Sequence, residues 1–302
     1  MLDRPNIEIE ASNNSDELKI EFEVPHDGFT QTIREKTKKI IEALNIENKN
    51  YHFKIKKYFD EHLGIGSKTQ LSLAIATAIS KLEGLDISVD LLAKIVGRGG
   101  TSGIGWRGFE TGGFILDGGH DFGDGKEKET FLPSSASPAS PALTLIRYPI
   151  PENWRFVEII PNVKKGAHGT EEVSIFQKYA PINREEVNEV SHQILMKILP
   201  GIIKNDLDCF GQGLKRIQAL GFKKIEIDLQ DLIVKQIFEF LDREKVKAYG
   251  MSSFGPCVVT ITDNEESAVI LKKKCEEFIR DVGGTVLIAK PNNTGAEIKI
   301  QE

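Results

Sequence analysis

The stretch from His62 to Leu71 reads HLGIGSKTQL and places glycines, two hydroxyl residues and a lysine directly before an apolar run. Backbone N–H groups at the start of a helix, with the positive end of its dipole, form a natural anion site. Ser67 and Thr69 would add hydroxyl donors, and Lys68 a positive charge. The order G-S-K-T differs from a Walker A loop. The residues alone leave two alternatives open, a polyphosphate-binding loop and an ordinary turn into a helix.

Two arginines, Arg98 and Arg107, lie in a glycine-rich cluster that spans residues 97–114. Glycine at this density lets the backbone approach a ligand or another segment closely. A guanidinium can grip phosphate or carboxylate through paired hydrogen bonds. The alternative is a tightly packed loop with solvated arginines, and it stays open above all for Arg107.

Asp117 and His120 follow the apolar residues FIL, which predict a strand. Carboxylates with a histidine can hold a hydrated Mg²⁺ beside phosphates. The same Asp- and Gly-rich composition also forms turns without function. We favour a functional role for Asp117 and His120. For Asp121 and Asp124, which follow them, we favour an ordinary turn.

The segment GMSSFGP, residues 250–256, separates two predicted strands. Its Ser252, Ser253 and Gly255 could face a ligand from a strand end. Ordinary hairpins use the same residue types, so the segment by itself does not decide between these alternatives.

The elements that must position these residues follow from the hydrophobic periodicity. Residues 6–23 alternate as half-exposed strands, residues 31–44 suit an amphipathic helix, and HFKIKKY alternates again. Ser67 and Gln70 fit a capping box, and the apolar arc that follows predicts an enclosed helix to about Leu82. A shorter helix, capped by Ser88 or Asp90, is expected through LLAKIV.

A Pro-, Ser- and Ala-rich segment, residues 132–151, is interpreted as a crossing between two domains, 1–150 and 151–302. Beyond it we expect a strand, several helices, two strands, a long helix and a final strand. That order is a ferredoxin-like arrangement with extra helices. The predicted fold class is therefore α+β.

Composition narrows the class of function. The 302 residues carry a net charge of −6 and no basic block, which argues against a nucleic-acid partner. The three cysteines are far apart and are expected to be isolated, reduced thiols. With no signal peptide and no membrane-spanning run, we expect a cytoplasmic protein without a membrane partner, and a homodimer is one option for its assembly.

Taken in order, these stretches resemble the GHMP kinases, in which a glycine/serine loop before a buried helix wraps the nucleotide phosphates. GMSSFGP is similar to that family's carboxyl-side glycine motif, which packs beside the phosphate loop. The loop departs from the usual GLGSSAA at Lys68 and Gln70. GIGSKTQ, GRGGTSGIG, FETGGFILDGGH and SSFGP together resemble one branch, the archaeal β-ribofuranosylaminobenzene 5′-phosphate synthases of methanopterin biosynthesis.

The resemblance implies a two-domain GHMP-kinase-like fold and a pentosyltransferase instead of a kinase. Such an enzyme joins phosphoribosyl pyrophosphate to 4-aminobenzoate or 4-hydroxybenzoate and releases CO₂ and pyrophosphate. It implies Mg²⁺ as the cofactor, and Lys68 and Asp117 as the catalytic residues, with Asp117 on the metal. The implied diphosphate contacts are Gly64, Gly66, Ser67, Lys68 and Thr69, and the other substrate contacts are Arg98, Arg107, His120, Ser252, Ser253 and Gly255.

Relatives begin with a further strand pair that carries the family's first motif, and this pair is expected to be missing here. Two other functions stay open: an ATP-dependent kinase of a small alcohol, and a ligand-binding relative without catalysis. The altered GSKT loop argues against the kinase.

Overall fold

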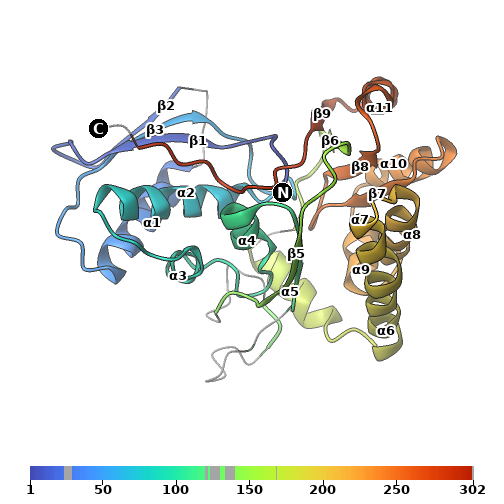
Figure 1. Ribbon diagram of the computed structural model, residues 1–302, viewed down its shortest axis with the longest axis horizontal. Helices are drawn as coiled ribbons and strands as arrows, with labels where there is room; N and C mark the ends of the chain where they lie inside the picture. Colours follow the sequence, from blue (N-terminus) through green and yellow to red (C-terminus); the bar gives the residue numbers. More distant parts are fainter. Residues whose placement is uncertain (24–28, 120–121, 123–129, 133–139, 168, 301–302) are drawn as a thin grey trace. The chain divides into compact units, whose positions relative to one another are not determined.

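The structure is a computed structural model (Figure 1) that describes residues 1–302 except 24–28, 120–121, 123–129, 133–139, 168 and 301–302. The chain forms two compact units. We call the first the ferredoxin-like unit; it contains Met1–Arg4, His62–Ile65 and Tyr148–Asn293. We call the second the α2 unit; it contains Pro5–Glu61, Gly66–Arg147 and Thr294–Glu302. The domain boundary that we expected at residue 150 stays a prediction. The ferredoxin-like unit also contains two short segments before that position, and the α2 unit contains one after it.

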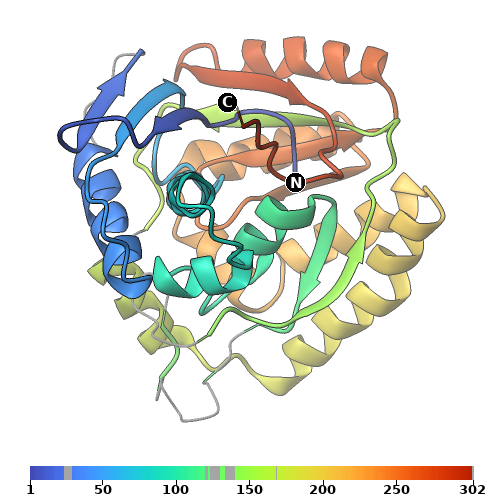
Figure 2. The same cartoon turned by 60° about the vertical axis from the view of Figure 1, so that its left-hand side comes forward.

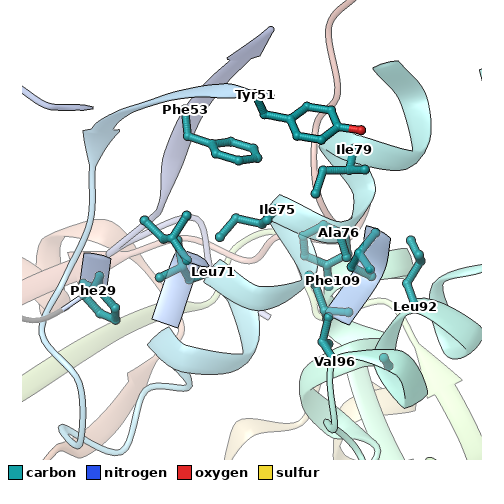
Figure 3. Close-up of a cluster of buried hydrophobic side chains, with 14 of the residues drawn as sticks. Phe29, Tyr51, Phe53, Leu71, Ile75, Ala76, Ile79, Leu92, Val96 and Phe109 are labelled. Carbon is teal, nitrogen blue, oxygen red and sulfur yellow. The ribbon is translucent and has the colours of Figure 1, made fainter. Parts of the chain in front are cut away.

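The α2 unit is built around helix α2 (Ser67–Leu82), of which 10 of 16 residues are buried. Its neighbours include a three-stranded sheet of order β1-β3-β2, in which β3 pairs antiparallel with β1 and parallel with β2. Alternate residues of β3, Phe53 and Ile55, are buried, as the period-two pattern predicts. Figure 3 shows Phe53 and Tyr51 facing Ile75 and Ile79 of α2 across this core.

The other helices of the α2 unit complete the same core. Helix α1 contributes Phe29, Ile33 and Ile40, and Leu92 and Phe109 come from α3 and α4. A second, two-stranded sheet pairs β4 with β5. The bounds are β1 Glu8–Ser12, β2 Lys19–Phe22, α1 Phe29–Ala43, β3 His52–Lys57, α3 Val89–Ile95, α4 Ile104–Thr111, β4 Phe114–Asp117 and β5 Thr144–Tyr148.

Helix α4 lies inside the glycine-rich cluster, for which a tightly packed loop was the alternative to a ligand-binding segment. That interpretation is wrong for residues 104–111, because Trp106 and Phe109 are buried on one side of a short helix. Glycine lowers helix propensity, so the helix depends on tertiary packing.

The ferredoxin-like unit has a four-stranded antiparallel sheet of order β7-β8-β6-β9. Helices α10 and α11 contribute Ile237, Leu241, Leu271 and Cys275 to the core on one face of this sheet. Figure 2 shows α11 running alongside the sheet. A strand, helices, two strands, a helix and an edge strand in this order confirm the predicted ferredoxin-like arrangement.

Between the first and second strands of this sheet, the chain forms further helices besides those that we expected. Helix α5 and helix α9 were not predicted. The bounds are β6 Arg155–Pro161, α5 Thr170–Tyr179, α6 Arg184–Gln193, the π-helical turn η1 Ile194–Ile198, α7 Leu199–Ile203, α8 Leu207–Gln218, α9 Gly221–Asp228, α10 Leu232–Arg243, β7 Ala248–Met251, β8 Val258–Thr262, α11 Glu265–Phe278 and β9 Gly284–Ala289.

No helix among the described residues has the length and apolar character needed to cross a bilayer.

Glu158 of β6 is an acidic residue inside the ferredoxin-like unit, 2% exposed, and its Oε2 accepts no hydrogen bond from the described residues. Burial, and then the charge of Asp3, raise its pKa from 4.5 to about 8. Between these two pH values the folded state therefore binds more protons than the unfolded state, and stability falls as pH rises.

We predict that Glu158→Gln flattens this pH dependence, which amounts to at most about 1.4 kcal/mol for each pH unit in that window. Urea unfolding at pH 5, 6.5 and 8 measures it, with exposed Glu266→Gln as the control. Equal slopes for the wild type and Glu158→Gln would contradict this assignment.

Candidate functional site

Gly66 directly precedes helix α2 as its N-cap residue and has a left-handed backbone with φ 78° and ψ 17°. No side chain caps the helix, so the predicted capping box of Ser67 and Gln70 is wrong. The Ser67 hydroxyl instead donates to the Asp60 carbonyl at 3.1 Å, and the Gln70 amide donates to the Gly105 carbonyl at 2.9 Å. Both side chains hold neighbouring segments in place.

The first N–H groups of α2 are those of Ser67 and Lys68. The Gly66 carbonyl accepts from the N–H groups of Thr69 and Gln70 at 3.0 and 3.1 Å, so the helix itself uses these later donors. The two preceding N–H groups have no intrahelical acceptor, as at any helix start. Lys68 Nζ adds a charge there and lies 4.0 Å from Glu61 Oε2, with 39% of its side chain exposed.

Thr69 joins the start of α2 to Arg98. Its Oγ1 accepts from Arg98 Nε at 2.8 Å and from Nη2 at 2.6 Å, and the residue is 8% exposed. A Cβ on Gly105 would lie 2.9 Å from Thr69 Cγ2, so the first turn of α4 must carry a glycine where it meets α2. This close approach fixes the Thr69 hydroxyl and, through it, the guanidinium.

Asp117, at the end of β4, organises the start of α4. Its Oδ2 accepts from Ser102 Oγ at 2.8 Å and from Gly103 N at 2.7 Å, and its Oδ1 accepts from Gly119 N at 2.9 Å. The α2 unit thus links Asp117 through α4 to the start of α2, where Lys68 and Thr69 lie. The predicted position of Asp117 at a strand end is confirmed; a role in catalysis or metal binding stays a prediction.

Arg107, the other candidate arginine, pairs with Glu110 one turn along α4, and its guanidinium lies 5.7 Å from the centre of the Trp106 ring. This pair accounts for Nη1 of Arg107, whereas its Nε is buried with no hydrogen-bond partner among the described residues. Arg98, which Thr69 fixes at the start of α2, is the better candidate for a cation that binds the substrate.

The ferredoxin-like unit brings together a second group of candidates. Ser252 Oγ donates to the Gly64 carbonyl at 2.7 Å. Gly64 has φ 85°, and a Cβ there would lie 2.2 Å from the Ser252 carbonyl oxygen. GMSSFGP was expected to pack beside the glycine-rich loop GIGSKTQ. The structure confirms this at Gly64, the first residue of that loop, and the contact requires a glycine there.

The turn at residues 252–257 is held by Lys223 of α9 and by Gln230, which lies two residues beyond the end of that helix. Lys223 Nζ donates to the Ser253 carbonyl at 2.9 Å, and Gln230 Nε2 donates to the Phe254 carbonyl at 2.8 Å. Ser253 itself has φ 48°, and Gly255 has φ 65°. These supports come from residues that the sequence analysis did not consider, because they are far away in sequence.

Lys36 of α1 was also missed. Its Nζ donates to the Val96 carbonyl at 2.7 Å. Its pKa is lowered to about 8, first by burial and then by the charges of Lys39, Arg98 and Lys68. No local sequence signal distinguishes this lysine from the others on the helix.

His120 lies outside the described residues, so its predicted substrate contact is not described. Among the residues that the structure describes, no three His, Cys, Asp or Glu side chains form a group that could hold a metal ion. Mg²⁺ commonly needs only one or two protein carboxylates beside substrate phosphates and water. Asp117 Oδ1, which accepts a single hydrogen bond, has capacity for such a contact.

Comparison with known proteins identifies the fold. The family model described as "GHMP kinases C terminal" matches residues 198–281. The chain is similar to a homoserine kinase from Cytophaga hutchinsonii, with a TM-score of 0.72, 16% identity, and coverage of 97% of this chain and 89% of that one. A phosphomevalonate kinase from Streptococcus pneumoniae gives a TM-score of 0.64 at 13% identity, over 94% of this chain and 88% of that one. The architecture is that of the GHMP kinases.

Comparison with curated proteins identifies the family more closely. β-Ribofuranosylphenol 5′-phosphate synthase from Methanocaldococcus jannaschii is 41% identical, over 98% of this chain and 90% of that one. The synthase of the same name from Archaeoglobus fulgidus is 43% identical, over 80% of this chain and 74% of that one. The chain belongs to the family of β-ribofuranosylphenol 5′-phosphate synthases, and the resemblance inferred from its motifs is confirmed.

Two glycines of the loop allow a matched test of the geometry. Gly64 and Gly66 both have positive φ, 85° and 78°, but a Cβ on Gly66 would meet nothing within 4 Å. Gly66→Ala should cost about 1 kcal/mol for the left-handed backbone alone. Gly64→Ala should cost about 3 kcal/mol, because the added methyl also displaces the Ser252 carbonyl.

Denaturant unfolding of both variants measures the difference. An equal cost at the two positions would contradict the described contact between Gly64 and Ser252.

Proposed function

We propose that this chain is a decarboxylating pentosyltransferase. It would join phosphoribosyl pyrophosphate to 4-hydroxybenzoate and form a C-riboside 5′-phosphate for methanopterin biosynthesis. One observation carries the proposal: the uncapped start of α2 combines unused N–H groups with Lys68 and with the fixed Thr69–Arg98 pair. The relatives, which are 5′-phosphate synthases by name, support this reaction over other uses of the fold.

The relatives' name also favours one acceptor. A ribofuranosylphenol retains a hydroxyl on the ring, so the benzoate that yields it by loss of CO₂ is a hydroxybenzoate. The aminobenzoate is the alternative acceptor and would give an aniline product.

The reaction balances without a redox partner. The bond between ribose C1 and the diphosphate oxygen breaks, and pyrophosphate leaves with the electron pair. The electron-rich ring carbon that bears the carboxylate then bonds to C1, while the ring hydroxyl donates electron density. The bond to the carboxylate breaks next, CO₂ leaves, and its electron pair restores the aromatic ring.

The protein's contribution is to hold charge and to position the two substrates. The N–H groups of Ser67 and Lys68, with Lys68 Nζ, would bind the diphosphate and stabilise the negative charge that develops as it departs. Thr69 would orient Arg98, which would bind a substrate phosphate or the benzoate carboxylate. Gly64, Arg107, His120, Ser252, Ser253 and Gly255 stay predicted contacts or supports.

Mg²⁺, when bound, would neutralise part of the diphosphate charge and make it a better leaving group. Asp117 is the residue of this chain that would hold it, through Oδ1.

A kinase reaction is the second candidate, because the similar structures include kinases by title. The two reactions differ in their products. Phosphoribosyl pyrophosphate with carboxyl-labelled 4-hydroxybenzoate should release labelled CO₂, whereas ATP with homoserine or phosphomevalonate should give no ADP above background.

We predict that Lys68→Ala lowers kcat/KM for CO₂ release by about 10- to 150-fold, which corresponds to a charged hydrogen bond of about 1.5–3 kcal/mol. Lys81→Ala is the matched control, because Lys81 lies at the other end of α2 and is within 3.5 Å of Asp86. It should change the rate by less than about twofold.

If Lys68→Ala releases CO₂ as fast as the wild type, Lys68 does not stabilise the departing diphosphate. If the wild type forms ADP but releases no CO₂, the protein is a kinase and the proposed synthase reaction is wrong.

A further inference from the structure

Ser253, in the turn at residues 252–257, has a left-handed backbone with φ 48° although it is not a glycine. A residue with a side chain pays free energy for this conformation, and such residues persist where the surrounding structure imposes it, often at functional sites. Ser252, the residue before it, donates through Oγ to the Gly64 carbonyl at 2.7 Å. The conformation of Ser253 therefore bears directly on the contact between this turn and residues 62–65.

An ion pair on helix α9 holds the carbonyl of Ser253. Lys223 Nζ donates to this carbonyl at 2.9 Å and is paired with Glu226, one turn along the helix. The Lys223 side chain is 22% exposed and that of Glu226 is 10% exposed, so the pair is largely withdrawn from water. Burial raises the pKa of the Glu226 carboxyl, and the charge of Lys223 opposes this rise.

Further contacts hold the next residues of the turn. Gln230 Nε2 donates to the Phe254 carbonyl at 2.8 Å, and a Cβ on Gly255 would lie 2.8 Å from Gln230 Oε1. The Phe254 ring, 6% exposed, lies 6.2 Å from that of Phe176 in α5 and 5.9 Å from that of Phe222 in α9, measured between ring centres. The two helices that the sequence did not predict, α5 and α9, thus both contact this turn.

The turn is joined to the segment before α2 at two points. Besides the bond from Ser252 Oγ to the Gly64 carbonyl, the Cys257 N–H donates to the Leu63 carbonyl at 3.3 Å. The Ser252 N–H donates to the Cys257 carbonyl at 2.9 Å, which links the two points. All these residues belong to the ferredoxin-like unit. A displacement of the turn is therefore passed on to residues 63 and 64.

Stability alone does not account for an ion pair at this place. A buried ion pair often contributes no more to stability than apolar side chains of similar size. The ammonium of Lys223 instead supplies a fixed donor for one carbonyl of a strained turn. Glu226 in turn fixes the ammonium and balances its charge.

We propose that Lys223 and Glu226 are positioning residues for the reaction. Their ion pair holds the Ser253 carbonyl, and the turn in consequence holds Gly64 in the position in which the sugar diphosphate is bound. The identity of the substrate rests on the proposed function; the coupling of α9 to residues 62–65 does not.

The main test is the double variant Lys223→Met with Glu226→Met, which removes the pair and leaves no buried charge without a partner. Lys223→Arg keeps the charge and the donors and is the conservative rescue. Lys224→Met is the matched control, because Lys224 is exposed on the same helix. Each protein is melted, assayed for CO₂ release over a range of phosphoribosyl pyrophosphate concentrations, and followed by hydrogen exchange at the Cys257 amide.

We expect the double variant to fold and to raise KM for phosphoribosyl pyrophosphate by about 10-fold, with kcat changed by less than about threefold. The reason is that a binding segment held in place contributes equally to the ground state and the transition state. A purely structural role would lower the amount of folded enzyme, which reduces the apparent kcat and leaves KM unchanged.

The other proteins should separate the effect of the pair from that of the helix surface. Lys223→Arg should keep KM within about threefold of the wild type, and Lys224→Met within about twofold. The Cys257 amide should exchange faster in the double variant than in the wild type, because its acceptor, the Leu63 carbonyl, is held less firmly.

If the double variant does not fold, Gln230→Met decides. It removes the donor to the Phe254 carbonyl and leaves both charges of the pair in place, and it should raise the same KM.

An unchanged KM for phosphoribosyl pyrophosphate in the folded variant, or unchanged exchange at the Cys257 amide, would overturn the proposal. If the wild type releases no CO₂, the proposed function fails. Exchange at Cys257 then decides by itself whether the ion pair positions residues 62–65.

Discussion

Helix α2 is buried along most of its length and yet begins without a side-chain cap, at a glycine in the left-handed conformation. The N–H groups of Ser67 and Lys68 at this start cannot be used by the helix itself. The side chains that could have capped them are engaged elsewhere, with Ser67 on the Asp60 carbonyl and Gln70 on the Gly105 carbonyl. The N–H groups of Ser67 and Lys68 are therefore left without a side-chain partner at the helix start. The proposed binding of the diphosphate depends on these two donors.

Positive charge gathers around the same helix start. Arg98 is fixed by two bonds to Thr69, and Lys36 is fixed by a bond to Val96, the residue after α3. These bonds fix the positions of both cations within the α2 unit. Preorganised charge of this kind stabilises a departing anion without the cost of reorganisation during the reaction. It explains how a kinase-like fold could serve a reaction whose leaving group is pyrophosphate.

The sequence was informative where its signals were local. Period-two strands and apolar helix arcs predicted the ferredoxin-like order. The resemblance of GMSSFGP to a family motif predicted that it packs beside the glycine-rich loop, as Ser252 does at Gly64. It failed where a tertiary contact decided the outcome. Helix α4 forms in a glycine-rich segment because Asp117 and packing against α2 hold it. Lys36 could not be singled out, because its burial and its like-charged neighbours exist only in the folded chain.

The most direct measurement is a crystal structure of the chain with phosphoribosyl pyrophosphate and Mg²⁺. The account predicts that diphosphate oxygens accept hydrogen bonds from the N–H groups of Ser67 and Lys68, with Lys68 Nζ on the same group. A sugar diphosphate bound at other residues, with these N–H groups facing water, would contradict it.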